Sequence, residues 1–534
     1  MVSLTSHSKI NIAQTTLLIA FFSLLSRVVG LFRDRIFAGQ FGAGDTLDVY
    51  YAAFRIPDFL FNLLILGTMT AAFIPVFAAY RLKDENAAWR LGNTIFNLTF
   101  LAMVFLSAVL FLFAPALLHL IVPGFSGEKL EQTLQLTRIM LVSPVFFALS
   151  SVFSSILNTF KKFVVVSILP IIYNLAIVFG ILVLYPKFGP KGLAFGVVLG
   201  AFLHLLLQLP ALMRIGYRWS PVLDLKSGGV ARFIKLFVPR IFTMDFSPII
   251  ASAIGSLMAV GSITAYNLAN NLQSVPLGVF AISYATVAFP HLADAAAKGD
   301  RDLFRKIFNS NLSQILYLMV PFSLLLLVLR AQIVRLLLGT GHFGWQDTIM
   351  TISALEFFAL SLFSQGLVPL LTRAFFSLRN TVAPVITGLV SALINLFLAW
   401  FLVNRYNMGV AGLALSFSVS SIANLLMLFG WLEFKYGNLI DRFLILKIEK
   451  ILVATVAMAI SSYATLYLVA PFVNTRTVVG LGFQTLISLV VGMLVDLGFG
   501  YILNLSESRH IVRTTSTWLA KLRVAFFRAG DWGM

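Results

Sequence analysis

Apolar runs of about 20 residues recur along the whole chain, and no other feature limits its fold as strongly. Of its 534 residues, 59% are hydrophobic and only 11% are charged, whereas soluble domains carry about 25% charged residues. Runs of this length match membrane helices, because the strands of a transmembrane barrel would appear as shorter, alternating segments. The sequence therefore predicts an all-α polytopic membrane protein.

We interpret these runs as about 14 transmembrane helices. They cover approximately 12–38, 47–80, 91–121, 134–159, 164–185, 192–213, 236–258, 262–290, 308–329, 348–372, 381–403, 410–432, 451–470 and 477–503. The Lys and Arg residues gather in the termini and the even-numbered loops, so the positive-inside rule places both termini in the cytoplasm. This topology and attraction to anionic lipids explain the net charge of +18, so we expect no nucleic-acid partner.

A repeated segment divides the chain into two lobes. Gly189-Pro-Lys-Gly-Leu-Ala194 recurs as Gly409-Val-Ala-Gly-Leu-Ala414, and Asn174-Leu-Ala-Ile recurs upstream as Asn395-Leu-Phe-Leu at nearly the same displacement. A repeat of six spans preserves orientation, which predicts a parallel pseudo-two-fold axis along the membrane normal. We expect an N-lobe at 1–222, a C-lobe at 223–440, two C-terminal helices at 441–505 and a cytoplasmic basic amphipathic tail at 506–534. The alternative is that such Gly-Leu-Ala turns are simply common in membrane proteins.

The predicted first span contains an unusual group of charges, namely Arg27, Arg33, Asp34 and Arg35. A charged side chain near the bilayer centre costs about 2.5–3.5 kcal/mol, so such charges usually face a watery cavity or a partner. At about 100° per residue, Arg27 and Asp34 share one helix stripe with small and hydroxyl residues, which suits an anionic ligand. The structural alternative is that Arg27 pairs with Asp34 while Arg33 and Arg35 reach an interface.

Further candidates lie in the second, seventh and eighth spans. Asp48, Arg55 and Asn62 are spaced by seven residues on one helix face, and Pro57 should kink that helix and free backbone carbonyls. The second-lobe candidates are Arg240, Asp245, Asn267, Asn270 and Asn271. The charged members could be ion pairs, and the amides could simply join helices.

The sequence lacks the motifs typical of enzymes that make or break covalent bonds. It has no cysteine, no nucleotide-binding loop and no nucleophile elbow, and its six histidines are scattered without metal-ligand spacing. We therefore expect a transporter rather than an enzyme, with no cofactor and no metal site.

Several motifs stand out along the chain. They are Ser26-Arg-Val-Val-Gly-Leu-Phe-Arg-Asp34, Phe41-Gly-Ala-Gly, Asp48, Ala53-Phe-Arg-Ile-Pro57, Ala72-Phe-Ile-Pro-Val-Phe77 and Leu371-Thr-Arg-Ala-Phe-Phe-Ser-Leu-Arg-Asn-Thr-Val-Ala-Pro384. Together these motifs resemble the MurJ (MviN) family of lipid II flippases. The resemblance implies the fold of the multidrug and polysaccharide flippase superfamily, with alternating access around a cationic cavity for lipid II. By motif, Arg27, Arg33, Asp34 and Asp48 match the family's functional charges.

The chain also departs from that family's pattern. Phe61-Asn62 and Leu66-Gly67 stand where the family has a basic pair and Glu-Gly, and Asn271 stands where it has an arginine. The acidic residue that the family has in span 7 for a sodium site would fall near Ala251 in this chain. These functions are either missing or have moved to Arg55, Arg240 or Asp245, and the coupling to sodium, protons or the membrane potential stays open.

The main hypothesis is a flippase of the bacterial inner membrane for lipid II in peptidoglycan and cell-wall synthesis. A pyrophosphate favours the planar donors of arginine, and no lysine falls within the predicted spans, whereas arginines do. Arg27 and Arg33 would contact the pyrophosphate, with Asp34 orienting them and Arg55 assisting. The alternatives are a flippase for another lipid-linked oligosaccharide, an exporter of organic cations, and a non-transporting scaffold that binds cell-wall synthesis proteins.

Overall fold

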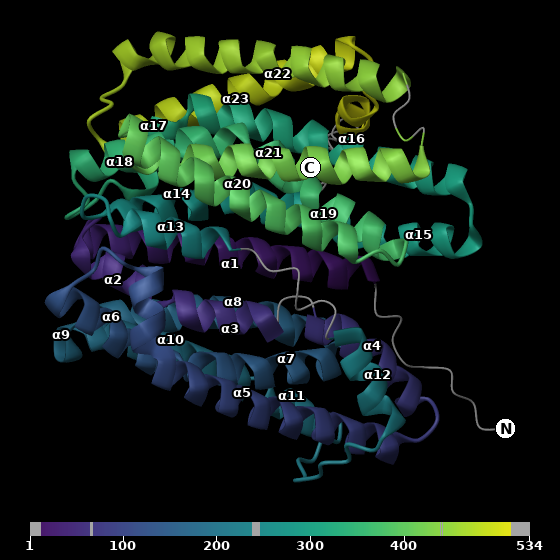
Figure 1. Ribbon diagram of the computed structural model, residues 1–534. Coiled ribbons are helices and arrows are strands. Elements are labelled where there is room, and N and C mark those ends of the chain that lie inside the picture. The colour runs from purple at the N-terminus through teal and green to yellow at the C-terminus, as the bar shows by residue number, and fades with distance from the viewer. Residues whose placement is uncertain (1–11, 65–67, 238–245, 438, 440–441, 514–534) are drawn as a thin grey trace, which may run out of the picture. The chain divides into compact units, whose positions relative to one another are not determined.

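The computed structural model describes residues 12–64, 68–237, 246–437, 439 and 442–513 (Figure 1). Helices are the regular structure throughout this part, and no strand occurs among the described residues. The predicted all-α class is therefore confirmed.

Contacts between residues divide the chain into two compact units. Unit 1 comprises residues 1–271, 337–351 and 392–416, and unit 2 comprises 272–336, 352–391 and 417–534. These contact-defined units are not the sequence-defined lobes, whose boundaries stay a prediction.

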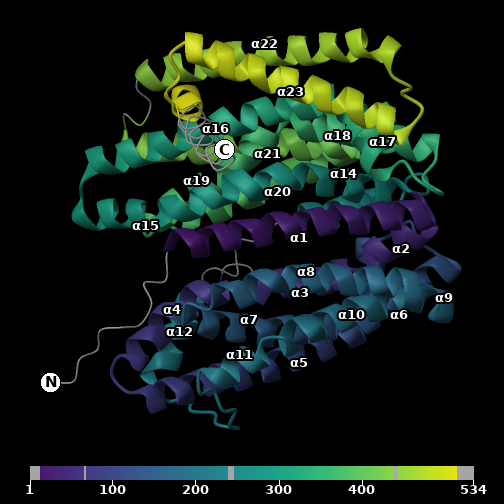
Figure 2. The same ribbon diagram turned by 180° about the vertical axis from the view of Figure 1, so that it is seen from behind.

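Unit 1 contains the first thirteen α-helices and one π-helix. They are α1 (Ile12–Phe41), α2 (Asp45–Ala53), α3 (Arg55–Leu64), α4 (Thr68–Arg81), α5 (Glu85–Ile121), α6 (Gly127–Met140), α7 (Ser143–Thr159), α8 (Phe163–Phe179), η1 (Gly180–Leu184), α9 (Tyr185–Phe188), α10 (Pro190–Leu206), α11 (Leu209–Arg214), α12 (Gly228–Phe237) and α13 (Ser247–Gly255). In both Figure 1 and Figure 2, α5, α7 and α10 run side by side, with α6 and α9 at one end.

The remaining helices belong to unit 2 or contribute residues to both units. They are α14 (Ser262–Pro276), η3 (Leu277–Ala281), α15 (Ile282–Lys298), α16 (Arg301–Val328), α17 (Arg330–Leu338), α18 (Trp345–Leu360), α19 (Leu362–Ser377), α20 (Val382–Tyr406), α21 (Gly409–Tyr436), α22 (Arg442–Val469), η4 (Ala470–Phe472) and α23 (Val478–Ile502). The antiparallel pair α22 and α23 lies side by side in both views and corresponds to the two predicted C-terminal helices.

Nine helices of the described residues are long and apolar enough to cross a membrane. The bent pair α18 and α19, which meet at 48°, makes a tenth if it is one span. The predicted number of fourteen is therefore not confirmed. The predicted second span is divided into α2, α3 and α4, and the predicted seventh includes the undescribed residues 238–245.

The break between α2 and α3 has a chemical cause. Pro57 has no N–H to donate to the carbonyl of Ala53, four residues earlier, so the helical hydrogen bond is lost there. The hydroxyl of Thr137 on α6 lies 3.3 Å from this freed carbonyl oxygen, and it also donates to the carbonyl of Thr133 at 2.8 Å. The helix is interrupted at Phe54, between α2 and α3, as the predicted kink requires.

Close backbone contact holds η1 against α10. A Cβ atom added at Gly196 would lie 2.7 Å from the Cα atom of Gly180, and one added at Gly180 would lie 2.8 Å from the Cα atom of Gly196. Small residues at such crossings allow membrane helices to approach and gain dispersion energy.

Replacing Gly196 by leucine should therefore lower the thermal unfolding midpoint of the detergent-solubilised protein. Overpacking of this kind typically costs about 1–3 kcal/mol. Gly388→Leu on α20 is the matched control, because an added Cβ there has no neighbour within 4 Å. Equal midpoints for the two variants would contradict the close packing of η1 and α10.

Candidate functional site

The most polar interior group of unit 1 lies around Arg33 and Asp34 on α1. The Nε and Nη2 atoms of Arg33 donate to Oδ1 of Asp34 at 3.0 and 2.7 Å. The carboxylate is buried, with 2% of the residue exposed, whereas 21% of the Arg33 side chain stays accessible. Asp34 therefore orients the guanidinium of a side chain that is still partly accessible.

Two amides from other helices complete this group. Nδ2 of Asn271 on α14 donates to Oδ2 of Asp34 at 3.0 Å, and Nη1 of Arg33 donates to Oδ1 of Asn174 on α8 at 2.9 Å. We call Arg33, Asp34, Asn174 and Asn271 the Arg33 cluster. Three of its members are predicted site residues. The fourth, Asn174, was identified in the sequence only as part of the internal repeat.

Arg55 forms a second buried polar contact in unit 1. Its Nε atom donates to the hydroxyl of Ser252 on α13 at 2.6 Å, and its Nη2 atom donates to Oδ1 of Asn267 on α14 at 2.8 Å. Only 6% of Arg55 is exposed. These contacts indicate that Arg55 joins α3 to α13 and α14.

Tyr51 on α2 lies near enough to three charged groups, Arg33, Asp34 and Arg55, to be affected by their charges. Its hydroxyl oxygen is buried and has no hydrogen-bond partner among the described residues. Buried hydroxyl groups normally find a partner, so an unsatisfied one marks a place where a ligand can supply it. We did not predict Tyr51, because a tyrosine in a membrane helix usually serves packing or the interface.

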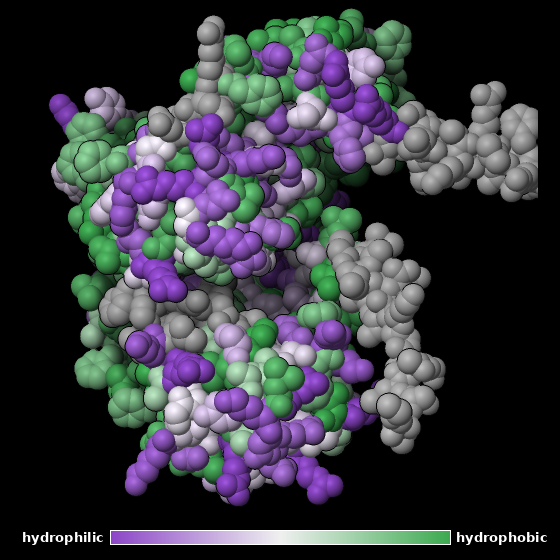
Figure 3. Space-filling view, turned by 90° about the vertical axis from the view of Figure 1, so that its right-hand side faces the viewer, coloured by the Kyte–Doolittle hydropathy of each residue, from purple (hydrophilic) through white to green (hydrophobic). Residues whose placement is uncertain are grey.

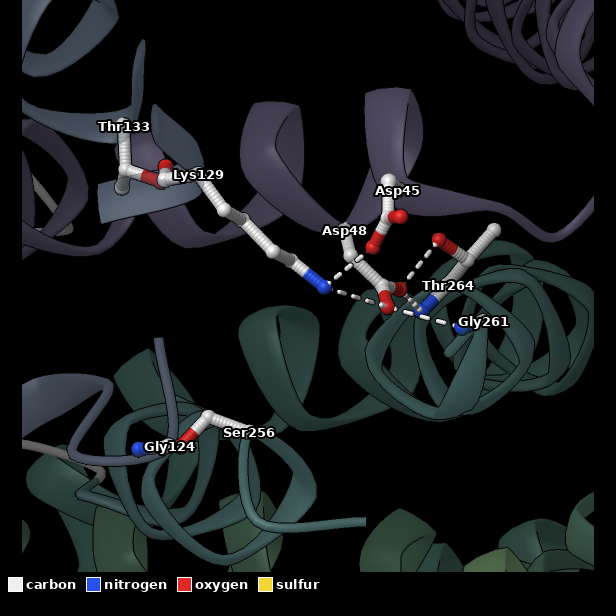
Figure 4. A network of polar contacts seen from close by, with 8 residues as sticks. All are labelled: Asp45, Asp48, Gly124, Lys129, Thr133, Ser256, Gly261 and Thr264. Carbon is white, nitrogen blue, oxygen red and sulfur yellow. Dashed lines mark hydrogen bonds and ion pairs between the residues drawn. The ribbon is translucent and has the colours of Figure 1, made fainter. Parts of the chain in front are cut away.

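Asp48 on α2 accepts hydrogen bonds from the beginning of α14 (Figure 4). Its Oδ2 atom accepts from the backbone N–H of Gly261 at 2.7 Å, and its Oδ1 atom accepts from the N–H and hydroxyl of Thr264 at 2.9 and 2.7 Å. A carboxylate is favoured at a helix N-terminus, where backbone N–H groups lack partners. On the other side of Asp48, the ammonium of Lys129 lies 3.7 Å from Oδ2 and also binds Asp45.

The loops around this contact approach one another through glycines. Gly261 has a φ of +87°, and an added Cβ there would lie 2.1 Å from the carbonyl oxygen of Ala43. Nearby, the N–H of Gly124 donates to the hydroxyl of Ser256 at 3.1 Å (Figure 4). The loops can approach Asp48 this closely only because Gly261 carries no side chain.

The other predicted residues lie elsewhere on these helices or outside the described part of the chain. Arg27, Asn62 and Asn270 have intermediate exposure on α1, α3 and α14. Arg240 and Asp245 lie outside the described residues.

Comparison with known proteins gives a consistent family. The family model for the lipid II flippase MurJ matches residues 37–482. The chain is 27% identical to the probable lipid II flippase MurJ of Borreliella burgdorferi, covering 90% of this chain and 94% of that protein. It is also 27% identical to the lipid II flippase MurJ of Burkholderia cenocepacia, covering 79% and 87%.

Solved structures agree with the sequence relatives. A lipid II flippase MurJ in an inward closed conformation matches with a TM-score of 0.75 and 26% identity, covering 91% of this chain and 98% of that chain. An inward-facing multidrug transporter of the MATE family matches with a TM-score of 0.65 and 13% identity, covering 79% and 98%. The second likeness concerns the fold alone.

The contact of Asp48 with α14 can be tested by amide hydrogen exchange. Asp48→Asn removes the negative charge and one of the two equivalent acceptors, and hydrogen bonds to charged groups contribute about 1.5–3 kcal/mol. We expect exchange at Gly261 and Thr264 to accelerate at least tenfold. Asp45→Asn, whose side chain is 62% exposed, is the control and should leave these amides protected. Unchanged exchange in Asp48→Asn would contradict the capping role.

Proposed function

The chain belongs to the lipid II flippase MurJ family, and from that premise we propose that its Arg33 cluster receives the pyrophosphate of the lipid-linked substrate. The family identity makes the chain a multi-pass membrane transporter, a flippase for lipid II that works by alternating access. What we add is an assignment of roles to its own residues.

The observation that carries the proposal is that the partly accessible Arg33 side chain is held in place while two of its five donors have no described hydrogen bond. A guanidinium has five N–H donors in a planar fork, and the described hydrogen bonds of Arg33 use three of them. The remaining donors can bind a phosphate oxygen by charge-assisted hydrogen bonds. Asp34 holds the guanidinium in place, and Asn271 holds Asp34, so the donor is oriented before the substrate arrives.

Tyr51 provides a neutral donor for the same anion. Its unsatisfied hydroxyl supports a direct hydrogen bond to a phosphate oxygen when the site opens. This donor would partly replace the cations that the family has where this chain has Phe61, Asn62 and Asn271.

The other candidates take supporting roles under this proposal. Arg27 would contact the substrate beside Arg33 on α1, and the amides of Asn62 and Asn270 would face the head group. Arg55 would position α13 and α14 through Ser252 and Asn267 rather than bind substrate. Asp48 would hold the beginning of α14, and Arg240 and Asp245 would supply second-lobe charge.

We place the protein in the bacterial inner membrane with both termini in the cytoplasm, on the distribution of Lys and Arg. We also propose that the chain forms two six-span lobes and catalyses no enzymatic reaction. Contacts with cell-wall synthesis proteins are part of the same proposal. A different lipid-linked oligosaccharide remains the second candidate, because Asn271 replaces a charge that the family resemblance leads us to expect.

Arg33→Ala should reduce the initial rate of lipid II translocation in reconstituted vesicles by at least tenfold. The reason is the loss of charge-assisted hydrogen bonds of about 1.5–3 kcal/mol each. Arg90→Ala is the matched control, because Arg90 is exposed in the second turn of α5. Native mass spectrometry should show that the unaltered protein binds lipid II in preference to a lipid-linked O-antigen precursor, and that Arg33→Ala weakens the binding of lipid II. Normal transport by Arg33→Ala would refute this site, and preferential binding of the O-antigen precursor would favour the second candidate.

Tyr51→Phe should change stability and affinity in opposite directions. Removing an unsatisfied buried hydroxyl relieves a cost of about 1–3 kcal/mol, so the unfolding midpoint should stay equal or rise. Affinity for lipid II, measured in the same native mass spectrometry assay, should fall about tenfold. Tyr185→Phe, whose residue has intermediate exposure in α9, should leave both quantities unchanged. An unaltered affinity in Tyr51→Phe would show that the hydroxyl has no ligand role.

A further inference from the structure

We infer that unit 2 contains a binding site for the phosphate head group of an anionic membrane phospholipid, between the beginnings of α16 and α22. The site is a cavity of about 450 Å³ that does not include any residue of the Arg33 cluster. It is independent of the proposed substrate site, because all its lining residues belong to unit 2.

The lining of this cavity is mainly cationic and rich in hydrogen-bonding groups. It carries Arg305, Lys306 and Lys447 against a single acid, Asp302, and its other members are Asn309, Ser310, Ser313, Phe443 and Leu444. Three cations beside amide and hydroxyl groups provide both the charge and the directional donors that a phosphate requires. The end face in Figure 3 is rich in hydrophilic side chains, as expected for a head-group level.

Lys447 and Asn309 form a fixed wall of the cavity. The ammonium of Lys447 donates to the hydroxyl of Ser313 at 3.0 Å and pairs with Glu507 at 2.6 Å, and the side chains of this pair are each 14% exposed. Nδ2 of Asn309 donates to the carbonyl oxygen of Leu439 at 2.8 Å. The Lys447 charge is therefore already paired, and the rest of the lining still contains more cations than acids, with Arg305 and Lys306 beside Asp302.

The cavity lies just outside two predicted membrane spans. Arg305 on α16 precedes the predicted span 308–329 by three residues, and Lys447 on α22 precedes the predicted span 451–470 by four. Both helices begin after even-numbered loops of the predicted topology. The positive-inside rule therefore assigns the cavity to the cytoplasmic leaflet, where anionic lipids concentrate.

Apolar side chains next to the cavity favour a lipid over a soluble phosphate. Phe443 lines the cavity and is 74% exposed, and Ile445 and Leu446 on the same helix are 48% and 45% exposed. A phospholipid could place its phosphate against Arg305 and Lys306 while its acyl chains cover these side chains. Such a lipid would also bridge α16 and α22, and so support the packing of these two helices within unit 2.

The test compares lipid binding to the full-length protein by native mass spectrometry. The probes are phosphatidylglycerol, phosphatidylcholine and inorganic phosphate. Arg305→Gln combined with Lys306→Gln should lower the apparent affinity for phosphatidylglycerol at least tenfold, since each basic residue near a membrane contributes about 1 kcal/mol. Lys298→Gln combined with Arg509→Gln removes the same charge from exposed positions outside the cavity and should change the affinity less than threefold.

A second variant separates the two phosphate sources. Phe443→Ser should weaken phosphatidylglycerol binding without altering the binding of inorganic phosphate, because it removes only the apolar wall. Unfolding midpoints of all variants, measured without added lipid, verify that the fold is retained. The inference is overturned if both charge variants lose affinity equally, if inorganic phosphate displaces the lipid at equal concentration, or if phosphatidylcholine binds as well as phosphatidylglycerol.

Discussion

A carboxylate inside a membrane helix must find its hydrogen-bond donors within the protein, and unit 1 is organised around two such groups. Asp34 and Asp48 are each only 2% exposed. Because an unpaired ionised group in hydrocarbon is very costly, each requires donors from other segments. Asp34 receives a guanidinium from its own helix and an amide from Asn271, whereas Asp48 receives backbone N–H groups from the start of α14. Both carboxylates therefore fix α14 against the first two helices of the chain.

The same requirement applies to the backbone. Pro57 frees the carbonyl of Ala53, and the hydroxyl of Thr137 on the neighbouring helix lies 3.3 Å from its oxygen. At the N-terminus of α14 the unpaired backbone groups are donors, and Asp48 accepts hydrogen bonds from N–H groups that have no helical partner. The glycine at 261 allows this approach because a side chain there would collide with the carbonyl of Ala43. Helix breaks and helix ends are thus the places where unit 1 joins its helices by polar contacts.

These contacts explain how far the sequence could predict the site. A charged residue within an apolar run can be recognised from the sequence alone. Arg33, Asp34, Asp48 and Arg55 could therefore be selected in this way, and so could the kink at Pro57. The partners could not be assigned, because a hydrogen bond between residues 34 and 271, or 33 and 174, depends on how separate helices cross. Tyr51 was missed for a related reason. An unsatisfied hydroxyl is a property of the surroundings, and the surroundings of α2 come from distant segments.

The charge balance of the Arg33 cluster bears on release as well as binding. A transporter has to let its substrate go, and a group of unpaired arginines around a pyrophosphate would hold it strongly, since hydrogen bonds between charged groups contribute more than neutral ones. Here Asp34 cancels the charge of Arg33, and Asn271 and Tyr51 offer neutral groups where further cations would increase affinity. Under the proposed function, the departures from the family's pattern thus replace charge by oriented neutral donors. Recognition then depends on the positions of these donors around the phosphate. A conformational change between inward and outward access can separate the donors and so release the substrate.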